Sequence, residues 1–287
     1  MRLAFIKYHG LGNDFLLFDG RDLPFAFAGS LARRLCDRHT GVGADGVLLW
    51  TGSVEAPRMQ VVNADGSSPE MCGNGLRCFV KFLLDEHAPS RLHLHVATGA
   101  GMLLCVAERG PDGGVKTVAA SMGLGSYEPA AVPIARTSPL VDEEIEVPGR
   151  SLRLTAIGTG NPHGVTFDAV TAEERAQIGP FLSENELFPQ RANIEFVQQL
   201  GPGEDGTPRL QVDVYERGCG WTQACGTGAT AAVLVAARLG MVPSEREVAV
   251  RLPGGWLGIT AHADGSATMR GPAVEVYRGE VDLDALG

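Results

Sequence analysis

Short apolar runs, continuous or alternating with polar residues, follow one another along most of the chain. They are rich in Val, Leu, Ile and Thr and are separated by turn residues such as Gly, Pro and Asp, which is typical of β-strands. In the first half, the pattern predicts strands near residues 2–8, 15–18, 46–50, 58–62, 91–97, 101–107 and 115–121. In the second half, it predicts strands near residues 151–157, 164–167, 193–198, 209–215, 246–252, 256–261, 267–270 and 273–277. The chain is therefore expected to be rich in strands.

Helical patterns are fewer. They predict helices at about residues 29–38, from Gly73 to about residue 87, from Thr171 onward and at about residues 226–239. The third begins with Thr171-Ala-Glu-Glu174, a capping box in which Thr and Glu satisfy N–H groups at the helix start. The last carries Ala, Val and Leu around most of its circumference. We expect strands to surround this helix, because a helix that packs by one face keeps a polar opposite side.

Two stretches of the first half recur, in the same order, in the second half. The sequence GLGNDFLLFD at Gly10–Asp19 resembles GTGNPHGVTFD at Gly158–Asp168. The sequence MCGNGLRCFVKFLL at Met71–Leu84 resembles ACGTGATAAVLVAA at Ala224–Ala237. Between the halves, residues 127–150 hold four prolines and an acidic cluster without clean periodicity, so we interpret them as a linker. The pattern predicts duplication of one unit built of strands and helices.

The repeat and the length of 287 residues predict a two-domain protein of the α/β class, α+β type. We expect an N-terminal domain at residues 1–125, completed by residues 272–287, and a C-terminal domain at residues 126–271. The two domains are expected to be pseudo-symmetric. Each would be a curved, mostly antiparallel sheet wrapped around a central apolar helix.

Charge and hydropathy exclude two kinds of partner. The chain has 24 Lys and Arg against 34 Asp and Glu, a formal net charge of −10, which gives no basic surface for nucleic acid. The longest apolar run, Gly228–Gly240, is shorter than the ~20 residues of a membrane span. Lys7 and Asp14 interrupt the first apolar stretch too early for a secretory signal. We therefore expect a cytoplasmic protein without nucleic-acid or membrane partners.

Two of the six cysteines, Cys72 and Cys225, stand directly before Gly-x-Gly and an apolar helix. The N-terminus of a helix stabilises a thiolate and is expected to lower the pKa of such a thiol from about 8.5. The glycines allow a carboxylate to approach the backbone N–H groups. Two such thiols on opposite sides of one α-carbon would suffice for a racemase without a cofactor, one thiol removing the proton and the other returning one.

The other cysteines predict no metal site. Cys72 and Cys78, like Cys219 and Cys225, are six residues apart, whereas structural zinc sites usually place two to four residues between ligands. A four-thiolate zinc site is therefore disfavoured, and Cys78 is interpreted as a core residue together with Cys36 and Cys105. His93 and His95 share a strand face but have no third ligand nearby in the sequence, so they are assigned no role.

Several motifs together resemble the diaminopimelate epimerase family, in family order and over essentially the full length. They are HGLGNDF, NADGSSPEMCGNGLRCF, GTGNPHGVTF, ANIEFV and YERGCGWTQACGTGA. The resemblance implies a cofactor-independent isomerase that interconverts LL- and meso-diaminopimelate, the small-molecule substrate, in lysine and peptidoglycan precursor biosynthesis. It also implies two similar α/β domains with the active site between them, and a homodimer.

Carried over residue by residue, the resemblance makes Cys72 and Cys225 the two acid/base thiols. It implies that His163 supports these thiols, and that the carboxylate of the reacting centre is bound by Gly73, Asn74, Gly226 and Thr227. It places the remaining substrate contacts on Asn13, Asn63, Asn161, Asn193, Glu216 and Arg217. Such a set suits a substrate with an amino-carboxylate at each end, because Arg can pair with the distal carboxylate and Glu with an ammonium.

The chain departs from the family pattern at two positions. Trp221 stands where the family commonly has Glu, and Gly46 where some members have Gln.

The sequence leaves two other functions open. One alternative is a proline or hydroxyproline racemase, which also uses two thiols, although Asn74 and the preceding Glu216-Arg217-Gly218 segment favour the epimerase. The other is a non-catalytic amino-acid-binding redox sensor, in which Cys72 and Cys225 form a regulatory disulfide.

Overall fold

A computed structural model describes residues 1–21 and 23–286 of the chain, so the last residue of the predicted C-terminal segment lies outside it. The chain forms two compact units. The first consists of residues 1–120 and 271–287, and the second of residues 121–270. Both units mix strands and helices, which confirms the predicted α+β class.

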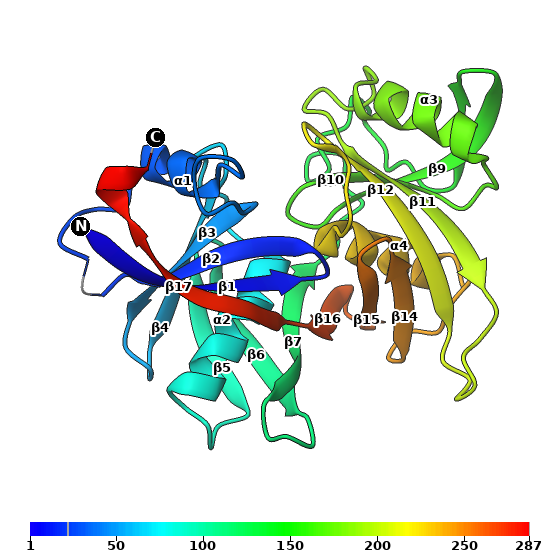
Figure 1. The fold of residues 1–287 in the computed structure, drawn as a ribbon. Coiled ribbons are helices and arrows are strands. Elements are labelled where there is room, and N and C mark those ends of the chain that lie inside the picture. Colours follow the sequence, from blue (N-terminus) through cyan, green and yellow to red (C-terminus); the bar gives the residue numbers. More distant parts are fainter. Residues whose placement is uncertain (22, 287) are drawn as a thin grey trace. The chain divides into compact units, whose positions relative to one another are not determined.

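The first unit is built on a sheet whose last strand comes from the C-terminal end of the chain. Its strands are β1 (Arg2–Gly10), β2 (Asn13–Asp19), β3 (Gly46–Gly52), β4 (Pro57–Asn63), β5 (His93–Thr98), β6 (Gly101–Arg109), β7 (Val115–Leu124) and β17 (Val274–Asp282). Its helices are α1 (Gly29–Cys36), α2 (Gly73–Glu86) and the 3₁₀ turn η1 (Leu283–Ala285). β17 lies beside β1 and pairs with it in antiparallel fashion, as Figure 1 shows in red and dark blue.

The second unit contains the other strands. Its strands are β8 (Glu143–Val147), β9 (Arg150–Gly158), β10 (Pro162–Thr166), β11 (Asn193–Leu200), β12 (Arg209–Glu216), β13 (Gly220–Trp221), β14 (Glu247–Leu252), β15 (Gly255–Ala261) and β16 (Ser266–Pro272). Its helices are α3 (Ala172–Ser183) and α4 (Gly226–Arg238). The predicted capping box at the start of α3 is present, with the side chains of Thr171 and Glu174 each bonded to the other's backbone N–H. Among the described residues, the sequence pattern missed two short strands, β8 and β13.

The two units repeat one order of strand pairings. In the first, the pairs from β1–β2 to β6–β7 are antiparallel, parallel, antiparallel, parallel, antiparallel and antiparallel. In the second, the pairs β9–β10, β10–β11, β11–β12, β12–β14, β14–β15 and β15–β16 follow the same series. The predicted duplication is confirmed, so α2 and α4 occupy equivalent places.

Each unit packs around an apolar helix, as predicted. In the first unit, Phe79 and Leu83 of α2 are buried in one core with Leu17 of β2 and Leu48 of β3. In the second, every residue of α4 from Gly228 to Ala236 is buried. Figure 1 shows α2 and α4 lying against the strands of their own units. A helix that is apolar all round is stable only in such surroundings, because each face must be removed from water.

The predicted linker at residues 127–150 is wrong. Val132 and Leu140 are fully buried in the core of the second unit, and β8 pairs with β9. Buried residues of this segment, such as Val132 and Leu140, stand next to prolines and among exposed residues, so they show no periodicity although they occupy core positions. Their burial is decided by tertiary contacts, which the local pattern does not carry.

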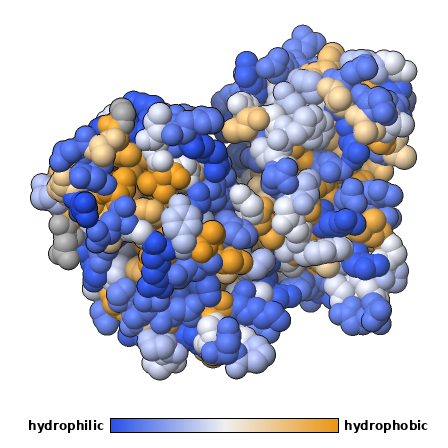
Figure 2. Space-filling model, in the orientation of Figure 1, coloured by the Kyte–Doolittle hydropathy of each residue, from blue (hydrophilic) through white to orange (hydrophobic). Residues whose placement is uncertain are grey.

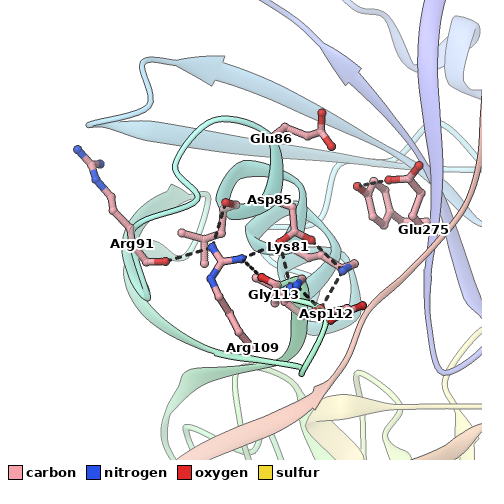
Figure 3. A network of polar contacts seen from close by, with 12 residues as sticks. Lys81, Asp85, Glu86, Arg91, Arg109, Asp112, Gly113 and Glu275 are labelled. Carbon is pink, nitrogen blue, oxygen red and sulfur yellow. Dashed lines mark hydrogen bonds and ion pairs between the residues drawn. The ribbon is translucent and has the colours of Figure 1, made fainter.

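The C-terminal end of α2 is held by a polar network around Asp85 (Figure 3). The Asp85 carboxylate accepts hydrogen bonds from Lys81 at 2.8 Å, from Arg109 at 3.1 Å and from the backbone N–H of Val115 at 2.9 Å. Lys81 also donates to the Val115 carbonyl at 2.8 Å. These contacts join the helix to β6 and β7. They fix the helix whose other end carries Cys72.

Hydrophilic residues predominate on the face shown in Figure 2, with apolar residues between them. Exposed apolar side chains alternate along β6, at Met102, Leu104 and Val106. In the described part of the chain, none of the helices has the length and hydropathy needed to span a membrane. The predicted homodimer stays a prediction.

Asp14 on β2 lies in an ion cluster. Its side chain is largely buried and lies 2.8 Å from Lys7 and 2.7 Å from Arg38. Burial alone would raise the pKa of Asp14, but the hydrogen bonds from Arg38 and Lys7 outweigh it and lower the pKa to about 2. The carboxylate therefore stabilises the fold at pH values above its usual pKa of 3.8, and this contribution is lost as the pH falls through about 2.

Asp14→Asn is expected to lower the free energy of unfolding at pH 7 by about 1–2 kcal/mol, after allowance for the solvent exposure of Arg38. In the wild type, the Asp14 carboxylate becomes protonated at low pH. The difference in unfolding free energy between the two proteins should therefore shrink as the pH falls from about 4 to about 2, the usual and the folded pKa of Asp14. Urea unfolding across this range measures it. A difference that stays constant over the whole range would contradict the assignment.

Candidate active site

The two predicted thiols occupy equivalent positions at helix starts. Cys72 is the N-cap of α2, with φ −138° and ψ 112°, and its Sγ accepts a hydrogen bond from the Gly75 N–H at 3.4 Å. Cys225 is the N-cap of α4, with φ −117° and ψ 108°, and its Sγ accepts from the Gly228 N–H at 3.4 Å. The sulfur atoms thus take the place of the oxygen of a usual N-cap side chain.

The first half-site joins Cys72 to two asparagines. Asn13 Oδ1 lies 4.0 Å from Cys72 Sγ and accepts a hydrogen bond from Asn74 Nδ2 at 3.1 Å. Asn13 begins β2 after a two-residue turn, in which both Leu11 (φ 57°) and Gly12 (φ 86°) are left-handed. Such a turn connects antiparallel strands tightly. It places Asn13 beside the helix start.

The other two predicted residues of this half-site lie differently. Gly73 is the first residue of α2, and its carbonyl accepts a hydrogen bond from Arg77. Asn63 ends β4, and its Nδ2 donates to Ser67 Oγ at 2.9 Å. The structure therefore brings Asn13, Asn74 and Gly73 to Cys72, and it shows Asn63 bonded to the loop that follows its strand.

The second half-site joins Cys225 to the end of β12. Thr227 Oγ1 lies 3.4 Å from Cys225 Sγ. Glu216 is the last residue of β12, and its Oε1 accepts a hydrogen bond from the Thr222 hydroxyl. Gly226 lies against a methionine: an added Cβ would be 3.0 Å from Met269 Sδ. Glu216 therefore places a carboxylate near the start of α4. The charge of this carboxylate contributes to raising the pKa of Cys225.

Arg217 and Asn193 are also brought together. The backbone N–H of Arg217 donates to Asn193 Oδ1 at 2.9 Å, and Asn193 is buried. The Arg217 guanidinium donates to the Gln190 carbonyl at 3.2 Å. A backbone carbonyl carries no net charge, so a substrate carboxylate would be the stronger acceptor for this guanidinium.

His163 forms a buried pair that the sequence reasoning did not find. Its Nδ1 lies 2.7 Å from Glu195 Oε1, and both side chains are fully buried. Its Nε2 lies 2.9 Å from Asn161 Oδ1. The signal in the sequence was Glu195, the single acidic residue of the strand segment ANIEFV. A carboxyl group that far from water requires a partner.

The contacts of His163 and Glu195 indicate where the protons of this pair lie. An amide oxygen only accepts, so Nε2 of His163 donates to Asn161, as the side-chain amide is oriented. One further proton then lies between Nδ1 and Glu195, and the pair has no net charge. Burial raises the pKa of Glu195, partly offset by His163, which agrees with a proton held at this contact.

The expected low pKa of Cys225 is wrong for this structure. Burial, followed by the charges of Glu216 and Glu195, raises the pKa of Cys225 well above its usual value. The hydrogen bonds from Thr227 and Gly228 oppose this shift but do not overcome it. The cost of burying a charge therefore exceeds the effect of the helix N-terminus. The raised pKa favours the thiol form of Cys225, which suits a proton donor.

Three of the remaining cysteines lie in the core, as predicted. Cys36, Cys78 and Cys105 are buried, and burial raises the pKa of each to about 12. Cys219 is exposed. His93 and His95 are exposed on β5. Within residues 1–21 and 23–286, no three His, Cys, Asp or Glu side chains are grouped to hold a metal ion.

Trp221 uses its ring to hold β13. The indole packs edge-on against Tyr215, with ring centroids 5.4 Å apart, and lies 5.9 Å from Phe196. On the other side it touches Gly179 of α3, where an added Cβ would be 3.1 Å from the indole. Trp221 thus has an aromatic side chain where the family commonly has a carboxylate. Its ring contacts hold the backbone next to Thr222, whose hydroxyl donates to Glu216.

A methyl group added at the glycine beside each thiol is expected to destabilise the two half-sites to different extents. In Gly228→Ala the new Cβ would lie 2.8 Å from Glu195 Oε1 and 3.3 Å from Cys225 Sγ. In Gly75→Ala it would lie 2.8 Å from the flexible end of Leu48 and 3.6 Å from Cys72 Sγ. Gly228→Ala should therefore lower the free energy of unfolding by about 1–3 kcal/mol, and Gly75→Ala by less. Chemical denaturation of both variants measures this, and an equal or reversed order would contradict the packing described.

Comparison with known proteins identifies the family. A sequence model described as diaminopimelate epimerase matches residues 5–123 and 155–281. The diaminopimelate epimerase of Synechococcus elongatus is 41% identical over 292 residues, covering 99% of this chain and 100% of the relative. That of Moorella thermoacetica is 43% identical over 294 residues, covering 98% and 100%.

Solved structures share the fold at low sequence identity. A phenazine biosynthesis protein of the PhzF family from Bacillus anthracis has a TM-score of 0.70 at 15% identity, covering 98% of this chain and 99% of its own. A probable proline racemase from Agrobacterium radiobacter has a TM-score of 0.66 at 15% identity, covering 98% and 93%. Matches along both units, at about 40% identity to full-length relatives, decide the assignment. The chain belongs to the diaminopimelate epimerase family of isomerases.

Proposed function

We propose that this protein interconverts LL- and meso-diaminopimelate by proton transfer at the α-carbon, with Cys72 and Cys225 as the two acid/base groups. The observation that carries the proposal is the equivalent placement of these thiols at the starts of α2 and α4, in a chain of this family. The two half-sites would act on opposite faces of one substrate molecule.

The reaction requires a base, an acid and stabilisation of the charge that develops on the carboxylate. One thiolate removes the α-proton, the carbon becomes planar, and the other thiol returns a proton to the opposite face. The first-turn N–H groups of α2 and α4, around Gly73-Asn74 and Gly226-Thr227, are suited to bind the reacting carboxylate. Helix N-termini favour negative charge there and cost no reorganisation during the reaction. No cofactor is required for this chemistry.

Specificity would come from the non-reacting end of the substrate. Arg217 is suited to the distal carboxylate, and Glu216 to an ammonium group. Asn13, Asn63, Asn161 and Asn193 would supply neutral donors and acceptors. A monoamino acid would leave such buried polar groups unpaired, and sites of this kind reject substrates that lack the matching group. Asn161 would be oriented by His163, which donates to its side-chain oxygen.

The test compares substrates under reducing conditions. The purified chain is incubated with LL-diaminopimelate and, separately, with L-proline, and stereoisomers are resolved by chiral chromatography. Meso product from the first and no racemisation of the second are expected. Racemisation of proline alone would favour the rival racemase, and binding without turnover would favour the redox-sensing alternative. The homodimer and the cytoplasmic location stay predictions.

A further inference from the structure

The duplication places unlike residues at equivalent positions beneath the two thiols. Leu48 is the third residue of β3, and Glu195 is the third residue of the equivalent strand β11. A Cβ on Gly75 would lie 2.8 Å from Leu48 Cδ2, and a Cβ on Gly228 would lie 2.8 Å from Glu195 Oε1. One thiol thus stands over an apolar side chain and the other over a carboxyl group.

A second pair of equivalent positions differs in charge. Arg77 and Thr230 each follow the half-site cysteine by five residues. Arg77 is 0% exposed, and its Nη1 donates to the Gly73 carbonyl at 3.3 Å. Thr230 Oγ1 donates to the equivalent carbonyl, that of Gly226, at 2.8 Å. The same backbone carbonyl therefore accepts from a buried cation in one half-site and from a neutral hydroxyl in the other.

Arg77 also orients the side chains at Cys72. Its Nη2 donates to Asn74 Oδ1 at 2.7 Å, so the Asn74 amide must turn its Nδ2 outward, where it donates to Asn13 Oδ1 at 3.1 Å. Nε of Arg77 donates to the Pro272 carbonyl at 3.2 Å. A guanidinium presents its donors in a rigid plane, so these contacts fix the three acceptors together.

The charge of Arg77 acts on the first thiol. Burial lowers the pKa of Arg77, and the charges of Cys78 and Cys72 oppose that shift. An arginine side chain nevertheless stays protonated in proteins. Asn13 faces Cys72 from β2; its side chain is neutral and donates to Asp45, which is paired with Arg38.

The groups facing the second thiol have the opposite effect. Glu216 faces Cys225 from β12, and Glu195 faces it from β11, where His163 of β10 shares its proton. Thr227 contributes a neutral hydroxyl. Negative charge at Glu216 disfavours a second negative charge on Cys225.

We propose that Arg77 is a positioning residue that holds Cys72 as the thiolate in the ligand-free protein, while Cys225 stays a thiol. If the proposed function holds, the diaminopimelate isomer whose α-hydrogen faces Cys72 binds next to a thiolate that is already able to remove this hydrogen as a proton. Cys72 Sγ takes that proton, and the Cys225 S–H bond gives its proton to the opposite face. The protein ends with a Cys72 thiol and a Cys225 thiolate, so before the next turnover in the same direction Cys72 must lose a proton to solvent and Cys225 must gain one.

Alkylation of the ligand-free full-length protein tests this without any substrate. Iodoacetamide reacts with thiolates, so the rate at each cysteine is followed against pH by peptide mass spectrometry, and the pH midpoint is compared rather than the rate. The variants are Arg77→Met, Arg77→Lys, which keeps a positive charge, and Thr230→Val, which removes the equivalent neutral contact.

In the wild type, Cys72 is expected to react with a midpoint at least about one pH unit below that of Cys225. Arg77→Met should raise the Cys72 midpoint by about one unit or more and leave that of Cys225 in place. Arg77→Lys should restore part of the shift, and Thr230→Val should leave the Cys72 midpoint unchanged.

Equal midpoints in the wild type would overturn the proposal, and so would an equal shift of both cysteines in Arg77→Met. If Arg77→Met does not fold, the wild-type comparison and Arg77→Lys decide. The outcome is separate from the substrate assignment, because alkylation of the free protein requires no turnover. A chain inactive on diaminopimelate can still show the unequal midpoints, and an active chain can lack them.

Discussion

Serine at position 72 or 225 is expected to lower kcat for epimerisation by about 10²–10⁴-fold, the usual contribution of a general acid or base. A hydroxyl keeps the N-cap hydrogen bond that each sulfur accepts, so the helix start and the fold should persist. A serine hydroxyl does not ionise near neutral pH and cannot exchange protons with an α-carbon as a thiol does. The measurement is the rate of meso product formation from LL-diaminopimelate for Cys72→Ser and Cys225→Ser.

Cys219→Ser provides the matched control, because Cys219 is exposed and lies six residues before Cys225. It should retain activity within about twofold, as surface substitutions usually have small effects. Retention of full activity by either Cys72→Ser or Cys225→Ser would show that its thiol is not an acid/base group.

Removal of the Glu195 carboxyl is expected to have the largest effect on stability. Glu195→Ala would leave His163 buried without its 2.7 Å partner, and loss of one member of a buried pair costs about 3–5 kcal/mol. Glu195→Gln is the matched control, since its amide keeps the shape and can donate to Nδ1 of His163. Urea denaturation at pH 7 should therefore show a large loss for Ala and a small one for Gln. Similar losses in the two variants would contradict the hydrogen-bonded pair.

The same pair predicts a pH dependence. Burial raises the pKa of Glu195 above its usual 4.5, so the folded state favours the protonated form. The stability contributed by that proton is complete below about pH 4.5 and is lost as the pH rises through the folded pKa. The free energy of unfolding of the wild type should fall with rising pH relative to Glu195→Gln. Parallel curves from pH 4.5 to pH 9 would contradict the raised pKa.

The elements of the fold were predictable where periodicity is local. The runs around β1 to β7 and the helix around α4 have clear periods, and the two Cys-Gly-x-Gly motifs revealed the duplication that the strand pairings confirm. The linker prediction at residues 127–150 failed because Val132 and Leu140 are buried as single residues next to prolines, without a repeating pattern. Their burial depends on strands far along the chain, and no local pattern records it.

The site was predictable in its backbone but not in its electrostatics. Glycines after a cysteine indicate a helix start, and both thiols lie there. The helix argument alone implied two similar, readily ionised thiols. The structure shows that burial, followed by the charges of Glu216 and Glu195, raises the pKa of Cys225, whereas the buried Arg77 donates to the carbonyl of Gly73, next to Cys72. These neighbours come from distant strands or from helix positions whose burial a sequence does not give.

In the proposed reaction, two thiols on opposite faces of one α-carbon exchange its proton with solvent. Its most direct test is the early hydrogen content of meso product formed from LL-diaminopimelate in deuterium oxide, read by mass spectrometry before substrate is appreciably consumed. We expect each product molecule to carry one deuterium from the second thiol, while unreacted substrate carries almost none. Product that retains the original hydrogen would mean that a single group removes and returns the proton, and the two-thiol account would be contradicted.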